Sequence, residues 1–261
     1  SSASTMAETA TENPNRSLTP GQIDSFHRDG FIVIGKLLEA SVLGELRSEY
    51  DRLFDEARRD NRYRNLAADS GAAQRHDEGA AEEMLQIMQC CERSLSFRRL
   101  LYSDPILDIV EDLIGPNIQL FHDQALFKPA HHGGPVHWHQ DNGYWRCIPA
   151  SLVSCWLTLD DVDADNGAMH MSPGSHLTAH DHERGDVLLD ASGAVSTVDP
   201  VVVDLPAGGA MFHHCQTLHT TPPNRSDRQR RAFAIHFMTP GTRNIHGDLP
   251  VSFARPLLRA G

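Results

Sequence analysis

The stretch Arg230-Arg-Ala-Phe-Ala-Ile-His-Phe-Met238 alternates between two kinds of side chain with the two-residue period of a β-strand. Neighbouring side chains of a strand point to opposite faces, so one face carries Arg230, Ala232, Ala234 and His236. The other face carries Arg231, Phe233, Ile235 and Phe237. An arginine followed by small residues is unusual on a core strand. This pattern is typical of a barrel whose mouth leaves room for a ligand, with Arg230 holding a carboxylate through paired hydrogen bonds.

A second interpretation of the same segment stays open. Arg225 and Arg228 follow a turn and are expected to be solvated. A solvated run that continued through Arg230 and Arg231 would explain these side chains without any ligand.

Short apolar runs of the same kind fill the chain after Pro116, where they alternate with Gly, Pro, Asn and Asp. Runs of this length between turn-forming residues predict β-strands. The predicted strands cover residues 118–127, 136–138, 152–159, 168–171, 201–204, 210–214 and 232–238. This succession favours an antiparallel sandwich or jelly roll.

The chain before Pro116 is predicted to be largely helical. Thr19 is a candidate N-cap, and Gly30 ends the first helix. The predicted elements are a helix from Pro20 to Asp29, a strand over 31–34, helices over 39–58, 81–90 and 94–114, and a surface loop over 59–80. Helices first and strands later indicate an α+β fold, with the helices packed on one side of a β core.

The length of 261 residues suits one large domain. We predict a disordered leader over residues 1–17, which are polar and rich in Ala, Ser and Thr. A single domain is predicted over 18–261, with a helical part over 18–115 and a jelly-roll core over 116–240.

The composition excludes several classes of protein. The 23 Lys and Arg residues are outnumbered by 35 Asp and Glu, and a net charge of −12 argues against nucleic-acid binding, which needs a basic surface. No apolar run is long enough for a membrane helix. The five cysteines include the adjacent pair Cys90-Cys91 and do not resemble a disulfide framework, so a cytoplasmic location is the default expectation.

Histidine is the commonest metal-binding side chain, and most of the 16 histidines lie in the β half, from His122 onward. One candidate site is Pro135-Val-His-Trp-His-Gln-Asp-Asn-Gly-Tyr-Trp145. If this stretch is a strand, His139 and Asp141 project from the same face, and one distant histidine would complete a 2-His-1-carboxylate iron site. His137 shares this face, so a His-x-His pair with His139 is an alternative, as is simple packing of these histidines.

The stretch Leu205–Asn224 offers three candidates for the distant histidine. His219 lies just before a turn, where the end of a strand could present it to a metal. His213 and His214 compete with it. Each of the three, taken alone, is more often a packed strand histidine than a ligand.

These segments belong to an ordered series of motifs. The series runs Phe26-His-Arg-Asp-Gly-Phe-Ile-Val-Ile34, Phe127-Lys-Pro, His139-Gln-Asp141, Trp156-Leu-Thr-Leu-Asp-Asp-Val162, Asn166-Gly167, Pro173-Gly-Ser-His176, Leu205-Pro-Ala-Gly208, Leu218-His-Thr-Thr-Pro-Pro-Asn-Arg-Ser226 and Arg230-Arg-Ala. In this order, over residues 18–240, the chain resembles the phytanoyl-CoA dioxygenase family of Fe(II)/2-oxoglutarate oxygenases. The resemblance implies a double-stranded β-helix, the jelly-roll or cupin-like core, with N-terminal helices on one side.

The resemblance also implies the metal ligands. His139 and Asp141 match the first two iron ligands of the family, and His219 matches the third. Other histidines then become packing residues or neighbours of the site, namely His137, His213 and His214.

Four further residues match positions that hold the co-substrate in the family. Arg230 matches the arginine that pairs with the distal carboxylate of 2-oxoglutarate, and Thr221 matches a hydroxyl that supports the same carboxylate. Gln124 and Trp156 fall near positions that line the co-substrate pocket.

By resemblance, the chain is a dioxygenase that oxidises an unactivated C–H bond of a small polar metabolite or natural-product intermediate, releasing succinate and CO2. Hydroxylation is the first expectation. Related halogenases have a small residue in place of this carboxylate, so Asp141 argues for hydroxylation or another oxidative outcome, such as desaturation or ring closure, over halogenation. Fe(II), 2-oxoglutarate and O2 are the implied cofactors, with ascorbate as a supporting reductant. The expected partner is a small-molecule substrate, with no nucleic acid and no membrane, and no pattern in the sequence indicates an oligomeric state.

Three alternatives stay open at this point. The same iron chemistry could lead to oxidative cyclisation or desaturation. The chain could be a non-catalytic jelly-roll module, or a zinc-dependent cupin-like enzyme that uses His137 and His139. Dependence on 2-oxoglutarate and on the metal separates an oxygenase from the last two.

Overall fold

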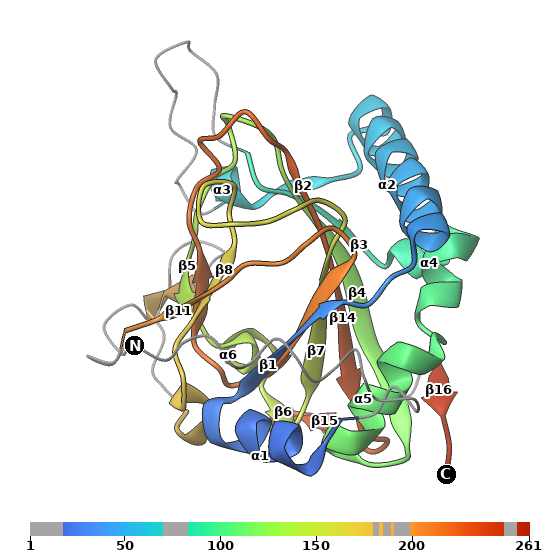
Figure 1. Cartoon of the computed structure of the whole chain (residues 1–261), viewed down its shortest axis with the longest axis vertical. Helices are drawn as coiled ribbons and strands as arrows, with labels where there is room; N and C mark the ends of the chain where they lie inside the picture. The colour runs from blue at the N-terminus through green and yellow to red at the C-terminus, as the bar shows by residue number, and fades with distance from the viewer. Residues whose placement is uncertain (1–17, 70–82, 180–182, 185–188, 191–198, 248–254) are drawn as a thin grey trace.

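The computed structural model describes residues 18–69, 83–179, 183–184, 189–190, 199–247 and 255–261. The predicted leader and much of the predicted loop lie outside these residues. Figure 1 shows a β core with the helices α2 (Ala40–Asp60), α4 (Leu95–Leu100) and α5 (Asp104–Ile114) along one side of it. The predicted α+β class with a jelly-roll core is therefore confirmed.

Two antiparallel sheets form the core. The larger sheet has the strand order β1-β12-β7-β14-β4-β3-β2, with β16 added beside β4. Its strands are β1 (Phe31–Lys36), β2 (Arg64–Asn65), β3 (Leu85–Met88), β4 (Ile118–Lys128), β7 (Val153–Thr158), β12 (Gly209–His214), β14 (Arg230–Met238) and β16 (Leu257–Arg259). The smaller sheet has the order β11-β8-β13-β5. Its strands are β5 (Val136–His139), β8 (Met169–Met171), β11 (Val201–Val203) and β13 (His219–Thr221).

The remaining elements are short or peripheral. The helices are α1 (Pro20–Asp29), α2 (Ala40–Asp60), α3 (Leu66–Asp69), α4 (Leu95–Leu100), α5 (Asp104–Ile114) and α6 (Asp141–Trp145). Two 3₁₀ turns cover Cys90–Glu92 and Ser175–Leu177, and two small ribbons pair β6 (Cys147–Ile148) with β15 (Arg243–Asn244) and β9 (Glu183–Arg184) with β10 (Leu189–Asp190). Thr19 caps α1 as predicted, in a capping box with Gln22, and Gly30 ends it at φ 83°.

The outer face of the larger sheet packs against the helices. Leu46 and Tyr50 of α2, together with Phe97 of α4, belong to one buried cluster with Phe233 of β14. The Phe97 and Phe233 rings lie 4.5 Å apart, and the Tyr50 hydroxyl donates to the Ala232 carbonyl at 3.0 Å. Burial of each such side chain contributes about 1.5–3 kcal/mol to the free energy of unfolding.

The inner face of the same sheet turns toward the smaller sheet. Trp156 of β7 and the small residues Ala232 and Ala234 of β14 cluster with Met169 and Met171 of β8. Because β14 presents alanines here, the two sheets do not close completely on each other. A cavity remains between them.

The structure corrects the predicted helix over 81–90. Residues 85–88 form β3, which pairs with β4, and buried Leu85 and Ile87 alternate with less buried Gln86 and Met88. That is the two-residue period of a strand. A helix was the wrong choice because so short a run leaves its periodicity ambiguous, and its partner strand lies far along the chain.

Two other expectations also change. The single helix predicted over 94–114 is divided into α4 and α5, since Pro105 occupies the first turn of α5 and a new N-terminus forms at Ser103. The predicted loop over 59–80 contains β2 and α3 in its described part. Among the described residues, none of the helices has the length and apolar character needed to cross a membrane.

Candidate metal and co-substrate site

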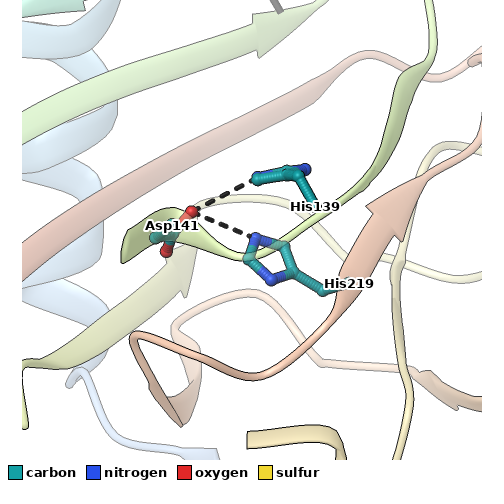
Figure 2. Close-up of side chains that lie close together, drawn as sticks. All are labelled: His139, Asp141 and His219. Atoms are coloured by element: carbon teal, nitrogen blue, oxygen red, sulfur yellow. Dashed lines mark ion pairs between the residues drawn. The ribbon is translucent and has the colours of Figure 1, made fainter. Parts of the chain in front are cut away.

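Three predicted ligands converge between the two sheets. His139 ends β5, Asp141 begins α6, and His219 begins β13, directly opposite His139 in the β5–β13 pairing. The Asp141 Oδ1 atom lies 3.3 Å from His139 Nε2 and 3.4 Å from His219 Nε2. Figure 2 shows both imidazoles turned toward this carboxylate. All three ligand atoms lie within 4.8 Å of one another, which is compatible with one shared metal ion.

The route by which Asp141 joins the histidines differs from the predicted one. The strand ends at His139, so the two residues are not neighbours on one strand face. The chain instead turns at Gln140 into α6. The Gln140 amide donates to the carbonyls of Thr178 and Gln216 at 2.8 and 2.7 Å, and these bonds fix the turn that directs the carboxylate back toward His139.

The backbone fixes which nitrogen of each histidine faces the carboxylate. His139 Nδ1 lies 2.7 Å from the His137 carbonyl, and His219 Nδ1 lies 2.8 Å from the Thr217 carbonyl. A carbonyl oxygen only accepts, so each Nδ1 carries a proton and donates it. The Nε2 atoms are thereby directed at the shared position, as in histidines that ligate a metal.

The charges of the three residues are coupled. Burial by itself raises the pKa of Asp141, but the neighbouring His219 and His139 lower it by more, so the pKa lies well below its ordinary value. Burial lowers the pKa of His219, and the neighbouring Asp141 more than offsets this, so the net shift is upward. The carboxylate is therefore ionised, and a divalent cation would take the place of the proton between the residues.

The competing histidines do not join the cluster. His137 is exposed and contributes only its carbonyl. His213 is buried, with its Nδ1 4.0 Å from the far carboxylate oxygen of Asp141, and burial lowers its pKa to about 4. His214 lies beside His176, with 5.5 Å between the ring centroids. A zinc pair built from His137 and His139 therefore has no geometric support.

A cavity of about 340 Å³ extends from these ligands into the space between the sheets. Its lining includes every predicted site residue: His139, Asp141, His219, Thr221, Arg230, Gln124 and Trp156. The lining also includes Gln86, Met88, His122, Tyr144, Trp145 and His236. None of Gln86, Met88 and His122 was singled out individually from the sequence, because isolated side chains of these types carry no spacing signature.

Arg230 belongs to the lining of the cavity and is unusual for a fully buried arginine in its contacts. It is fully buried, donates to the carbonyls of Gly167 at 2.8 Å and Leu126 at 3.2 Å, and stacks 5.4 Å from the Trp156 ring centre. Within the described residues it has no ion pair with any carboxylate, and its Nε is a buried donor without a partner. Burial lowers its pKa to about 10, so the guanidinium stays charged at neutral pH. These properties fit a site for an anionic ligand.

The other two predicted co-substrate residues are held in defined orientations. The Thr221 hydroxyl accepts a hydrogen bond from Lys128 Nζ at 2.8 Å. Gln124 accepts from the Gln86 amide, and its own amide nitrogen lies 2.8 Å from His236 Nε2. Lys128 was part of the quoted motif Phe127-Lys-Pro, but the sequence alone gave it no role.

Comparisons with known proteins point to one family. The phytanoyl-CoA dioxygenase (PhyH) family model matches residues 26–232. Phytanoyl-CoA dioxygenase of Mus musculus is 26% identical over 85% of this chain and 69% of its own length, and ectoine dioxygenase of Halomonas elongata is 27% identical over 86% and 71%. A protein of Stutzerimonas stutzeri named "Probable alpha-ketoglutarate-dependent hypophosphite dioxygenase" is 33% identical over 53% of this chain, but that match spans only 51% of its length.

Solved structures share the fold. The epimerase SnoN, crystallised with Fe3+, alpha ketoglutarate and nogalamycin RO, superposes with a TM-score of 0.73 at 23% identity, covering 92% of this chain and 98% of its own. The non-haem carbocyclase SnoK superposes with the same TM-score at 22% identity, covering 92% and 90%. The resemblance inferred from the ordered motifs is confirmed. The chain belongs to the phytanoyl-CoA dioxygenase family and is by class a non-haem Fe(II)/2-oxoglutarate-dependent dioxygenase.

Proposed function

We propose that this chain hydroxylates an unactivated C–H bond of a small polar molecule, converting 2-oxoglutarate to succinate and CO2. The observation that carries the proposal is the content of one cavity. It contains a complete 2-His-1-carboxylate set at His139, Asp141 and His219, together with a buried arginine, Arg230, that has no carboxylate partner among the described residues.

The ligand set suits Fe(II). Two neutral imidazoles and one carboxylate are the donors of the facial triad in non-haem iron oxygenases. The bound iron would supply the activation of O2, coupled to decarboxylation of the co-substrate. The protein holds the ligands, since His137 and Thr217 carbonyls orient the imidazoles before any metal binds.

Arg230 and Thr221 would hold the distal carboxylate of 2-oxoglutarate. The guanidinium offers a buried charge and an unused Nε donor, and burial strengthens its attraction for an anion. Gln124 and Trp156 would form the adjoining walls. The apolar side chains of Leu126 and Met169 line the same space and exclude water from it.

The remaining part of the cavity lining is proposed as the substrate site. Its walls are aromatic and amide side chains, including Tyr144, Trp145 and Gln86. Burial lowers the pKa of His122 to about 4, so this wall residue is neutral near pH 7. The only carboxylate in the described lining is Asp141, a proposed metal ligand. This wall favours a small polar substrate that is uncharged or anionic over a cationic one.

A screen for substrate-dependent succinate release tests the proposal. Turnover is expected only with Fe(II) and 2-oxoglutarate, in a buffer that contains ascorbate, and the product should contain one additional oxygen atom. A product that lacks two hydrogens instead would assign desaturation or cyclisation. Asp141→Ala should reduce both metal affinity and turnover more than about 100-fold, because the loss of a ligand exceeds the effect of losing an outer contact.

His137→Ala is the matched control, since its side chain is exposed and only its carbonyl contacts His139. This variant should retain wild-type metal affinity and turnover. Full turnover in Asp141→Ala would contradict the proposed function. Loss of metal binding in His137→Ala would revive the zinc alternative.

A further inference from the structure

Lys128 is a fully buried lysine at the end of β4 that the proposed chemistry does not use. Its ammonium group donates to the Thr221 hydroxyl oxygen at 2.8 Å and to the Pro222 carbonyl. Burial of an ammonium group is costly, and lysine is rarely fully buried unless its donors are hydrogen-bonded. Lys128 is absent from the described lining of the cavity, whereas Thr221 belongs to it.

The chemistry of the Lys128–Thr221 contact fixes the direction of the hydroxyl. An ammonium group has three donors and no acceptor, so the Thr221 oxygen must accept. The single hydroxyl proton of Thr221 then points away from Lys128. Within the described residues no acceptor for that proton is found, and the side chain faces the cavity. Lys128 therefore converts Thr221 into a donor directed at the cavity.

Gly167 ties this pair to Arg230. Its backbone has φ 100°, a conformation that favours glycine, and its carbonyl accepts from Arg230 at 2.8 Å. A Cβ atom on Gly167 would lie 3.0 Å from Lys128 Cδ and 3.4 Å from Arg230 Cδ. The stems of the two cationic side chains therefore pass close together beside the Cβ position of Gly167, and Arg230 and Thr221 both belong to the lining of the cavity.

We propose that Lys128 is a positioning residue for the distal carboxylate of 2-oxoglutarate, acting by holding the Thr221 hydroxyl as a donor beside Arg230. This inference rests on the proposed function, because it assumes that the carboxylate binds at Arg230 and Thr221. It adds a residue that acts through Thr221 and leaves the metal ligands untouched.

Binding without turnover gives the most direct test. Protein loaded with Ni²⁺ is titrated calorimetrically with 2-oxoglutarate and with 2-oxobutyrate, which has the same 2-oxo acid end but no distal carboxylate. Lys128→Met keeps the apolar stem and removes the donor. It should weaken 2-oxoglutarate binding about 10- to 100-fold, the range for a hydrogen bond to a charged group, and leave 2-oxobutyrate affinity unchanged.

A double-mutant cycle separates positioning from a structural role. Thr221→Val should weaken 2-oxoglutarate binding by a similar factor. The Lys128→Met/Thr221→Val double variant should bind 2-oxoglutarate no more weakly than Thr221→Val alone. Additive losses would show that Lys128 acts independently of Thr221 and would overturn the proposal. If Lys128→Met weakened 2-oxobutyrate binding as much as 2-oxoglutarate binding, the proposal would also be overturned, because that result would indicate general distortion of the site.

The wild-type protein provides two further tests. If Lys128→Met does not fold, a crystal structure of the wild-type Ni²⁺–2-oxoglutarate complex decides the matter. The proposal expects the Thr221 hydroxyl on the carboxylate and Lys128 still on Thr221; a direct contact between Lys128 and the carboxylate overturns it. If the wild-type protein shows no metal-dependent binding of 2-oxoglutarate, the proposed function itself fails, and the positioning role fails with it.

Discussion

The two faces of β14 carry neighbouring arginines in opposite states. On the outer face, Arg231 is clamped by carboxylates: its Nη2 lies 2.8 Å from Asp160 Oδ1, and its Nη1 lies 3.1 Å from Asp51. On the inner face, Arg230 is more deeply buried, and in the described part of the chain its polar and ring contacts are two carbonyls, a thioether and the Trp156 ring. The charge of Arg231 is paired with carboxylates of the protein, whereas Arg230 has no carboxylate partner among the described residues.

The side chains that follow the two arginines differ in the same way. The outer face continues with Phe233, Ile235 and Phe237, which complete the core beneath the helices. The inner face continues with Ala232 and Ala234, which leave the cavity open. A single strand therefore completes the core with one face and lines the cavity with the other. Paired substitutions across the strand should separate the two properties.

The largest contrast is expected between the two arginines. Arg230→Met should weaken 2-oxoglutarate binding to the Ni²⁺-loaded protein about 100-fold or more, because the buried carboxylate would lose its charged partner. Its free energy of unfolding should stay within about 1 kcal/mol of wild type or rise, since a buried cation without a carboxylate is replaced by an apolar side chain. Calorimetric titration and chemical denaturation measure the two quantities.

Arg231→Met is the control on the opposite face. It leaves Asp160 without its main partner, so the free energy of unfolding should fall by about 1–3 kcal/mol while the affinity for 2-oxoglutarate stays unchanged. If Arg231→Met weakened 2-oxoglutarate binding as strongly as Arg230→Met, the assignment of binding to the inner face and stability to the outer face would be wrong.

A smaller contrast is expected between Ala234 on the inner face and Phe233 on the outer face. Ala234 faces the cavity between Gln124 and Trp156, its partners on the adjacent strands. Ala234→Leu should reduce kcat/KM about 10- to 100-fold by occupying co-substrate space. Phe233→Leu on the other face should lower the free energy of unfolding by about 1–2 kcal/mol and leave turnover per folded molecule intact. A loss of stability without a loss of kcat/KM in Ala234→Leu, together with the opposite result in Phe233→Leu, would contradict the roles given to the two faces.

The division of β14 could be predicted from sequence because strand alternation is a local property. The residues Arg230 to Met238 contain the whole pattern, and the structure places Arg230, Ala234 and His236 on the cavity as the period requires. The convergence of His139, Asp141 and His219 was also anticipated, through an ordered series of motifs. Neither inference needed information about distant contacts.

What could not be predicted depends on contacts between distant segments. The strand β3 was assigned to a helix because its pairing with β4 decides its state. The turn at Gln140 depends on the carbonyls of Thr178 and Gln216, so Asp141 reaches the two histidines by a route that strand alternation did not predict. Lys128 was quoted in a motif, but its role depends on Thr221, which lies 93 positions away.

The smallest of the predicted effects concerns pH and again distinguishes the inner face. His122 pairs with His236 across β4 and β14, and burial, followed by the nearby Arg255, lowers its pKa from 6.5 to about 4. The folded state therefore binds fewer protons than the unfolded state between these values. Stability is then retained above pH 6.5 and lost progressively as the pH falls toward 4.

His122→Gln should reduce this acid sensitivity. In metal-free protein, the wild-type free energy of unfolding should fall between pH 7 and pH 5, and the variant should fall by about 1–2 kcal/mol less. Only part of the sensitivity is removed, because burial also lowers the pKa values of His213 and His214 to about 4. Chemical denaturation at several pH values measures the difference. An identical pH profile in the variant would mean that His122 is charged in the folded protein, and the inner wall would then attract anions more strongly than its neutral state allows.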